Sequence, residues 1–136
     1  MDMNPYLTFN GQCFEALSFY AEVFDGEVFD VMYFRDLPGA DPFPKGIGNR
    51  VMHMKMRLGG KLIMASDSQG TDAPRPEGFQ LQVGFDKLED AKKAFGALAE
   101  GGEIGMPFEP TFFAAGFGKC RDRFGIEWMI NCDQSA

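Results

Sequence analysis

The chain contains an internal repeat, and this repeat limits the possible folds more than any other feature of the sequence. The helix-like segment Glu15–Tyr20 returns as Asp90–Phe95, about 75 residues later. In each copy a strand-like run comes before the helix and three such runs follow it. We place the copies at residues 3–68 and 78–132, within a single domain of residues 1–136. The repeat therefore predicts two similar modules that bury their apolar surfaces together.

Two segments have the apolar periodicity of helices that lie on a sheet. In Cys13–Phe24 apolar residues recur every three or four positions, and Gly26 then ends the helix. Leu88–Glu100 has the same spacing and is followed by Gly101. Both apolar stripes are too short for a coiled coil, so we interpret them as core faces.

Eight short runs have the composition of β-strands. They are Tyr6–Phe9, Val28–Phe34, Arg50–Leu58, Lys61–Ser66, Phe79–Val83, Glu103–Phe108, Phe112–Phe113 with a possible continuation to Arg121, and Ile126–Asn131. The segments Asp36–Pro44 and Asp67–Gly78 are rich in proline and glycine and are predicted loops. The order is strand, helix and three strands, twice. We therefore predict an α+β fold of two βαβββ modules, whose curved mixed sheets surround a cup.

Strand alternation predicts which side chains face this cup. Leu81 and Val83 are expected to pack against the helix, so their neighbours in sequence point the opposite way. In the third strand the methionines share one face, and the histidine lies on the other. The predicted ligand-binding residues are polar or adaptable side chains of the cup: Tyr6, Thr8, His53, Gln80, Gln82, Phe113 and Met129.

Charge and hydropathy exclude several classes of partner. The net charge is −7, whereas phosphate binding requires a basic patch, so we expect no nucleic acid partner. A local cationic pocket would still be able to hold a small anion. No apolar run approaches the roughly 20 residues of a transmembrane helix. Met1–Pro5 lacks the basic and apolar regions of a secretory signal. We expect a cytoplasmic protein without a membrane partner.

The three cysteines, Cys13, Cys120 and Cys132, agree with a reducing compartment. They cannot all pair, and their spacing is unlike that of a metal site. Arg121 follows Cys120, so its charge would lower the pKa of that thiol a little. The alternative is a strand cysteine without chemistry.

Two further features have both a structural and a functional interpretation. His53 is the one histidine of the chain, and an imidazole acts as a base or a metal ligand near neutral pH. A hydrogen bond to a neighbour, or a place in a subunit interface, would explain it equally. The aromatic run Thr111–Gly118 would form a flap over a ligand, or would pack at a sheet edge or a dimer contact.

Several motifs carry a resemblance to a known superfamily. With the opening Glu15–Tyr20 and the turn Asp122–Gly125, the chain resembles the vicinal oxygen chelate superfamily of glyoxalase I, bleomycin-resistance proteins, fosfomycin-resistance enzymes and extradiol dioxygenases. It is similar in particular to the PhnB-like branch in four segments: Pro5–Leu7, Val51–His53, Leu62–Asp67 and Trp128–Asn131. The likeness spans nearly the whole chain.

The resemblance implies a place for a metal ion, and the residues at that place do not suit one. Enzymes of the superfamily hold a divalent ion on the first and last strands of the repeats, and the matching positions here are Tyr6, Met64, Gln80 and Met129. Thioethers are soft donors and do not replace carboxylates for a hard ion. Some members of the branch are named as ubiquinone-pathway methyltransferases. No glycine-rich strand-to-helix loop for a nucleotide-like cofactor is present here, so we expect neither metal nor cofactor.

Two functions remain as hypotheses. The first is a metal-free homodimer that binds a small, partly apolar molecule in the cup, built within one chain or across the dimer. The second is an enzyme of the glyoxalase or dioxygenase type with a non-standard metal site that uses Gln80 and His53.

Overall fold

The computed structural model describes residues 1–37, 46–70 and 75–133. The chain divides into two compact units, Met1–Pro74 and Arg75–Ala136, and each contains one copy of the repeat. Parts of the predicted loops Asp36–Pro44 and Asp67–Gly78 lie outside the described residues.

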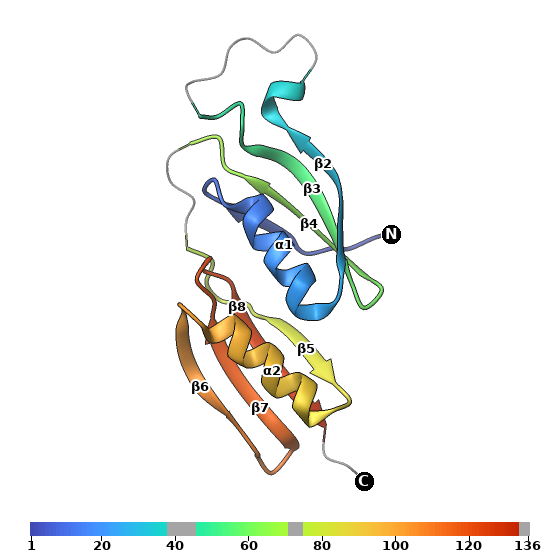
Figure 1. The fold of residues 1–136 in the computed structure, drawn as a ribbon, viewed down its shortest axis with the longest axis vertical. Helices are drawn as coiled ribbons and strands as arrows, with labels where there is room; N and C mark the ends of the chain where they lie inside the picture. The colour runs from blue at the N-terminus through green and yellow to red at the C-terminus, as the bar shows by residue number, and fades with distance from the viewer. Residues whose placement is uncertain (38–45, 71–74, 134–136) are drawn as a thin grey trace. The chain divides into compact units, whose positions relative to one another are not determined.

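The first unit is a four-stranded mixed sheet with one long helix (Figure 1). Its elements follow the chain as β1 (Tyr6–Phe9), α1 (Cys13–Phe24), β2 (Glu27–Tyr33), a short 3-10 helix (Phe34–Asp36), β3 (Val51–Leu58) and β4 (Lys61–Asp67). The strand order is β1-β4-β3-β2. β1 lies parallel to β4, and the other neighbours are antiparallel.

The second unit repeats this topology. Its elements are β5 (Leu81–Phe85), α2 (Leu88–Ala99), β6 (Glu103–Glu109), β7 (Ala114–Arg121) and β8 (Glu127–Asp133), with the order β5-β8-β7-β6. The parallel pair is β5 with β8. The predicted α+β class and the two βαβββ modules are confirmed. The cup around which they were expected to curve stays a prediction.

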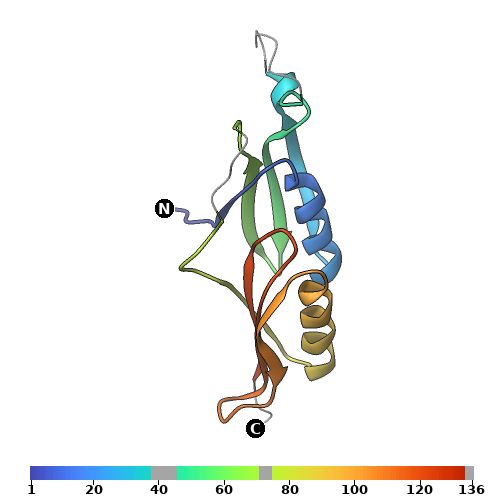
Figure 2. The same cartoon turned by 90° about the vertical axis from the view of Figure 1, so that its left-hand side faces the viewer.

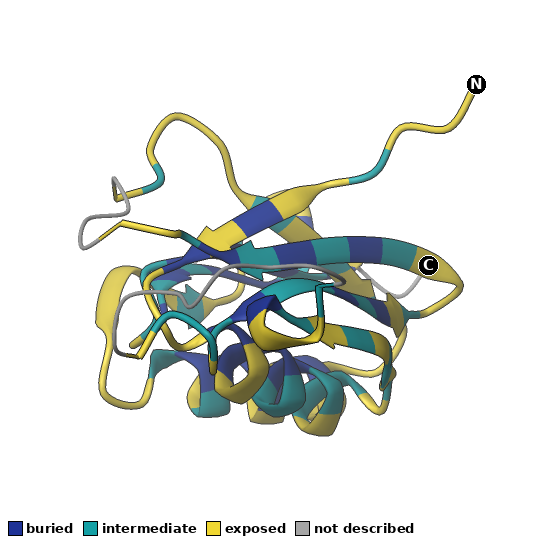
Figure 3. Cartoon of the chain, turned by 90° about the horizontal axis from the view of Figure 1, so that it is seen from above, coloured by how far each residue is buried: buried dark blue, intermediate teal, exposed yellow. Residues whose placement is uncertain are grey.

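Each helix covers one face of its own sheet (Figure 2). In the first unit Leu17 and Tyr20 of α1 are fully buried, as are Met54 and Met56 of β3. In the second unit Leu98, Trp128 and Ile130 form the corresponding core. Buried and half-buried positions alternate along the strands, and the outer sides of the helices are exposed (Figure 3). We call the face that a unit's own helix leaves uncovered its helix-free face.

The repeat extends to a backbone contact after each helix. A Cβ at Gly26 would collide with the carbonyl oxygen of Arg57, and a Cβ at Gly102 would collide with that of Arg121. Only glycine allows the chain to pass this close to the neighbouring strand. The two glycines therefore fix the same entry of β2 and β6 into their sheets.

Two details of the predicted strands are wrong. Regular alternation would put Val51 on the same face as His53, yet Val51 is 1% exposed, because the pairing of β2 with β3 shifts between Val51 and His53. Such a bulge reverses the alternation locally. The strand expected from Phe112 begins at Ala114 instead, because the hydroxyl of Thr111 accepts hydrogen bonds from the N–H groups of Phe113 and Ala114 and forms a turn.

Neither helix of the described ranges has the length and apolar character needed to cross a lipid bilayer.

Candidate functional site

The helix-free face of the first unit carries three of the predicted site residues. Tyr6 and Thr8 are exposed on β1, while Leu7 and Phe9 between and beside them are buried. The hydroxyl of Tyr6 lies 3.3 Å from Nδ1 of His53 on β3. Their ring centroids are 5.9 Å apart. The imidazole therefore has a neighbour that orients its ring, which is the structural interpretation of this histidine.

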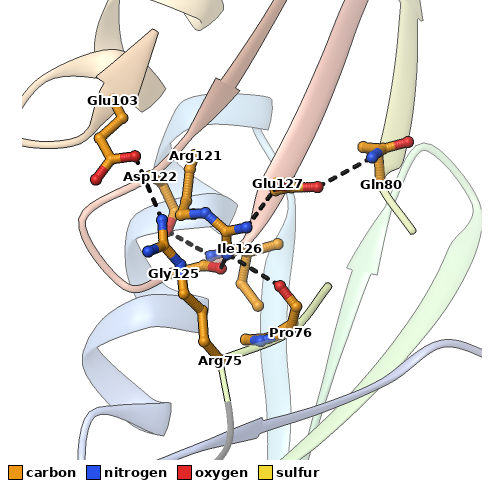
Figure 4. Close-up of polar contacts among 9 residues, drawn as sticks. All are labelled: Arg75, Pro76, Gln80, Glu103, Arg121, Asp122, Gly125, Ile126 and Glu127. Carbon is orange, nitrogen blue, oxygen red and sulfur yellow. Dashed lines mark hydrogen bonds and ion pairs between the residues drawn. The ribbon is translucent and has the colours of Figure 1, made fainter. Parts of the chain in front are cut away.

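The helix-free face of the second unit carries a polar network around Glu127 (Figure 4). Gln80 lies just before β5, and its Nε2 donates to Oε2 of Glu127 at 2.9 Å. The other carboxylate oxygen accepts from the guanidinium of Arg121. Arg121 also donates to the carbonyl oxygens of Gly125 at 2.7 Å and Pro76 at 3.0 Å. One carboxylate thus fixes both the amide and the guanidinium.

Burial makes this ion pair different from an ordinary surface pair. The side chains of Arg121 and Glu127 are 12% and 27% exposed. Solvent screens such a pair less than an exposed one, so its geometry is held more firmly. Neither residue was among the predicted site residues. Strand parity would have placed Glu127 on the face of Met129, but no local pattern indicates that it meets Gln80 and Arg121.

A pocket of about 200 Å³ lies beside this network. Its polar walls are formed by the Gln80–Glu127–Arg121 network together with Glu103 and Lys119. Its remaining lining is Ile104, Gly105, Cys120 and Trp128. A small concave site with a few convergent polar groups among apolar atoms is typical of ligand binding.

The pocket includes one of the predicted residues of this unit and leaves three outside. Gln80 lines the pocket, and Gln82, Met129 and Phe113 do not. Phe113 contacts Phe117, with ring centroids 5.2 Å apart. Phe117 pairs with Asn131, well along β8 from Glu127, so Phe113 lies towards the other end of this strand.

The strand register also changes the match between the repeats. Tyr6 pairs with Met64 in the first sheet, and Gln82 pairs with Met129 in the second. Gln82, rather than Gln80, therefore occupies the position that corresponds to Tyr6. The sequence alone matches Gln80 with Tyr6, because Gln80 is then expected to lie within the strand. In the structure Gln80 precedes β5.

The donor set of the described residues is poor in metal ligands. The described ranges contain no group of three or more His, Cys, Asp or Glu side chains placed to hold an ion. The side chains of His53 and Gln80 are both hydrogen-bonded within the protein.

Cys120 belongs to the pocket lining, and its thiol is buried and unreactive. Burial, and secondly the negative charge of Asp122, raise its pKa from 9.0 to about 11. The expected lowering of this pKa by Arg121 is wrong, because successive side chains of β7 point to opposite faces and Arg121 pairs with Glu127. Burial, with the charge of Asp67, likewise raises the pKa of the Cys13 thiol far above its ordinary value.

This raised pKa predicts slow alkylation of native Cys120. A pKa of about 11 instead of 9.0 leaves about 100-fold less thiolate at pH 8, and the thiolate is the reactive form. We expect iodoacetamide to label native Cys120 at least about 100-fold more slowly than urea-unfolded protein at the same pH. Peptide mass spectrometry over time measures both rates. Equal rates would show that the thiol is neither buried nor suppressed.

Comparisons with known proteins agree over nearly the whole chain. The model of a family described as 3-demethylubiquinone-9 3-methyltransferase matches residues 1–131. Protein YjdN of Escherichia coli strain K12 is 34% identical over 139 residues, covering 96% of this chain and 95% of that protein.

Solved structures give the same result. Protein PA1353 from Pseudomonas aeruginosa has a TM-score of 0.86 and 37% identity, covering 99% of each chain. A putative 3-demethylubiquinone-9 3-methyltransferase, PhnB protein, from Bacillus cereus has a TM-score of 0.84 and 25% identity, covering 97% of this chain and 99% of that one. A glyoxylase/bleomycin resistance protein/dioxygenase domain from Frankia sp. EAN1pec shares the fold, with a TM-score of 0.65 at 17% identity over 100% of this chain and 93% of that one.

Proposed function

The chain belongs to the 3-demethylubiquinone-9 3-methyltransferase family, a PhnB-like group with the glyoxalase/bleomycin resistance fold, and we propose that it binds a small molecule without a metal ion. The observation that carries the proposal is the pocket of about 200 Å³ on the helix-free face of the second unit. Gln80 and Arg121 are held in place around it by one carboxylate, that of Glu127. Polar groups fixed before binding orient a ligand at low entropic cost.

Soft donors support the metal-free part of this proposal. Met64 and Met129, at the matching positions of the two repeats, offer thioethers where a hard ion needs carboxylate or imidazole. An enzyme with a metal site at Gln80 or His53 would have to use side chains that already bond to Glu127 and Tyr6. Elemental analysis of protein purified without chelators tests this part. Stoichiometric Zn, Ni, Mn or Fe would contradict it.

Methyl transfer from a nucleotide-like donor is not part of the proposal. Such a donor is normally held by a glycine-rich turn between a strand and a helix. The turn between β1 and α1 has one glycine, Gly11, and its N–H already donates to the carboxylate of Asp67 at 2.8 Å. The turn between β5 and α2 consists of Asp86 and Lys87. Equilibrium dialysis with S-adenosylmethionine would test this reading, and saturable binding would contradict it.

The other predicted ligand contacts are also part of the proposal, although they do not line the pocket. Tyr6, Thr8 and His53 share the helix-free face of the first unit and are proposed to contact ligand there. Gln82, Met129 and Phe113 are proposed contacts beyond the pocket. A homodimer and a cytoplasmic location stay predictions. Sedimentation at micromolar concentration tests the dimer, and a monomer would contradict it.

Gln80→Leu is expected to weaken binding of a compound that a thermal-shift screen finds for the wild-type protein. The change removes the amide that lines the pocket while it keeps a similar volume. A ligand group left without its hydrogen-bond partner costs about 1–3 kcal/mol, which is roughly 5-fold to 150-fold in affinity. Isothermal titration calorimetry measures the change.

Gln80→Leu also removes a hydrogen bond within the protein. Gln80 has a protein partner, Glu127, so the leucine leaves one carboxylate oxygen to solvent. Because Gln80 is exposed and Arg121 still binds Glu127, we expect a loss of stability below about 1 kcal/mol. Gln82→Leu is the matched variant, since Gln82 lies on the same face outside the pocket. A larger loss of affinity in Gln82→Leu than in Gln80→Leu would place the ligand elsewhere on this face.

A further inference from the structure

The pocket of the second unit contains one lysine, Lys119. Lys119 of β7 lies between Met106 of β6 and Met129 of β8 in the strand register. Within the described residues no carboxylate forms an ion pair with its ammonium group. Lys119 is only partly exposed and is one of the residues that line the pocket.

In the first repeat, the lysine at the corresponding position has an acidic partner. Lys55 pairs with Met64 in the register, as Lys119 pairs with Met129. The ammonium of Lys55 lies 3.4 Å from the carboxylate of Asp30. Opposite Lys55 the chain of β2 reads Phe29 and then Asp30, whereas opposite Lys119 the chain of β6 reads Met106 and then Pro107. The second repeat therefore has the lysine without the acid.

The other acids at the pocket are already used by arginines. Arg57 of the first repeat binds its cross-strand neighbour Glu27 at 2.8 Å. In the second repeat Arg121 lies opposite Glu103 but binds Glu127, and Glu103 pairs with Arg75 at 3.3 Å. Each of these two carboxylates thus has its own guanidinium. Among the residues that the structure describes, the charge of Lys119 is therefore left without an acidic partner.

A bulge lies in the wall of the pocket next to this lysine. Ile104 pairs with Cys120 and Met106 with Lys119, so Gly105 is an extra residue in β6. A Cβ added there would meet Lys119 only at ordinary contact distance, 3.8 Å. In β2 the register runs without an extra residue at this point, and the ring of Phe29 lies 4.7 Å from the guanidinium carbon of Arg57. Bulges often reshape strands beside functional sites.

We propose that the pocket binds a ligand with a carboxylate group, and that the ammonium of Lys119 holds this carboxylate. The inference deepens the proposed function and rests on it. One uncompensated cation suits a singly charged carboxylate, since Arg121 is committed to Glu127 and two carbonyl oxygens. The amide oxygen of Gln80 points away from Glu127 and is placed to accept a hydrogen bond from a donor on the ligand (Figure 4).

The local charge matters because the whole protein repels anions. At a net charge of −7 an anion gains nothing from long-range attraction. A partly buried ammonium is screened less by salt and water than an exposed one, so its contact with a carboxylate is correspondingly stronger.

The test compares benzoate with benzamide, its neutral counterpart of nearly the same shape. Both are titrated into ¹⁵N-labelled protein, and amide chemical shifts of the pocket residues report binding. We expect benzoate to bind more tightly than benzamide to the wild-type protein. Lys119→Met is expected to weaken benzoate binding about tenfold or more and to leave benzamide binding unchanged. Phenyl phosphate, as a dianion, is expected to bind no more tightly than benzoate.

Two further variants separate the ligand contact from a general effect of charge. Lys55→Met removes the same charge at the repeat-related position, and benzoate binding should stay at the wild-type value. Met106→Asp places a carboxylate directly across from Lys119, within reach of a cross-strand ion pair. It should weaken benzoate binding as Lys119→Met does. Met106 is 45% exposed, so its replacement should leave the fold intact.

The outcomes distinguish this inference from the function on which it rests. Equal loss in Lys119→Met and Lys55→Met, or no loss in either, would overturn the role of Lys119. Benzamide that shifts the pocket amides as strongly as benzoate would overturn the carboxylate preference and support the small-molecule site. If neither compound shifts these amides up to its solubility limit, both the inference and the pocket proposed as the site are wrong.

Discussion

Asp122→Ala is expected to lower the free energy of unfolding of the second unit by about 3–5 kcal/mol. Asp122 is 3% exposed, and its carboxylate accepts hydrogen bonds from donors on three described residues. The donors are the N–H of Phe124 at 2.8 Å, the N–H of Ile126 at 3.1 Å and Nε1 of Trp128 at 2.8 Å. Alanine leaves these donors facing a buried gap, and each unpaired buried donor costs about 1–3 kcal/mol.

Urea unfolding followed by amide exchange in β7 and β8 measures this loss. Asp133→Ala is the matched control, because Asp133 is an exposed carboxylate in the same unit that bonds to Asn131. Its cost should stay within about 0.5 kcal/mol. In a double-mutant cycle, Trp128→Phe should cost less in the Asp122→Ala background than in the wild-type protein. Strict additivity would show that the indole bond contributes nothing.

Asp67→Ala is expected to lower the stability of the first unit by about 3–4 kcal/mol. Asp67 ends β4, is 5% exposed, and accepts the backbone N–H groups of Gly11 at 2.8 Å, Cys13 at 2.9 Å and Val51 at 3.0 Å. It joins the start of α1 to the bulged end of β3. Gln12, the N-cap residue of α1, forms no capping hydrogen bond with its side chain, so these N–H groups depend on Asp67.

The same variant should loosen the Tyr6–His53 contact, since His53 lies two residues beyond Val51. Amide exchange of β3 and the start of α1 should rise together, and exchange in the second unit's strands should rise less. Asp36→Ala is the control, because Asp36 is an exposed carboxylate that accepts one backbone N–H, from Tyr33 at 3.2 Å. Asp67→Asn should fall between wild type and alanine, since one oxygen is kept. If Asp67→Ala costs no more than Asp36→Ala, the carboxylate does not hold these segments.

The secondary structure was predictable because it depends on local spacing. The apolar period of Cys13–Phe24 places α1 at the bounds found in the structure, and α2 ends one residue before the expected Glu100. Alternation along Glu127–Asp133 separates Trp128 and Ile130, which are buried, from Met129, which is half-buried. These patterns follow the residue periods of a helix or a strand, so they can be recognised from residues that are close together in the sequence.

The site was predictable only in part, because its contacts join residues that are far apart in the chain. Gln80 and Glu127 are 47 residues apart, and so are Tyr6 and His53. The sequence predicted the strand face on which each side chain lies. The register of β5 on β8 decided that Gln82 pairs with Met129 while Gln80 reaches Glu127. The buried roles of Asp67 and Asp122 were missed for the same reason, since both residues look like ordinary turn acids.

The sequence by itself determined that this chain forms two βαβββ modules, each with one helix on a sheet, because hydrophobic periodicity and turn glycines act over a few residues. Only the tertiary structure decided which polar groups meet. An extra residue at Gly105 and the missing acid opposite Lys119 distinguish the second repeat from the first. Both depend on cross-strand register, which a strand shares with a partner far away in sequence and which local patterns do not specify.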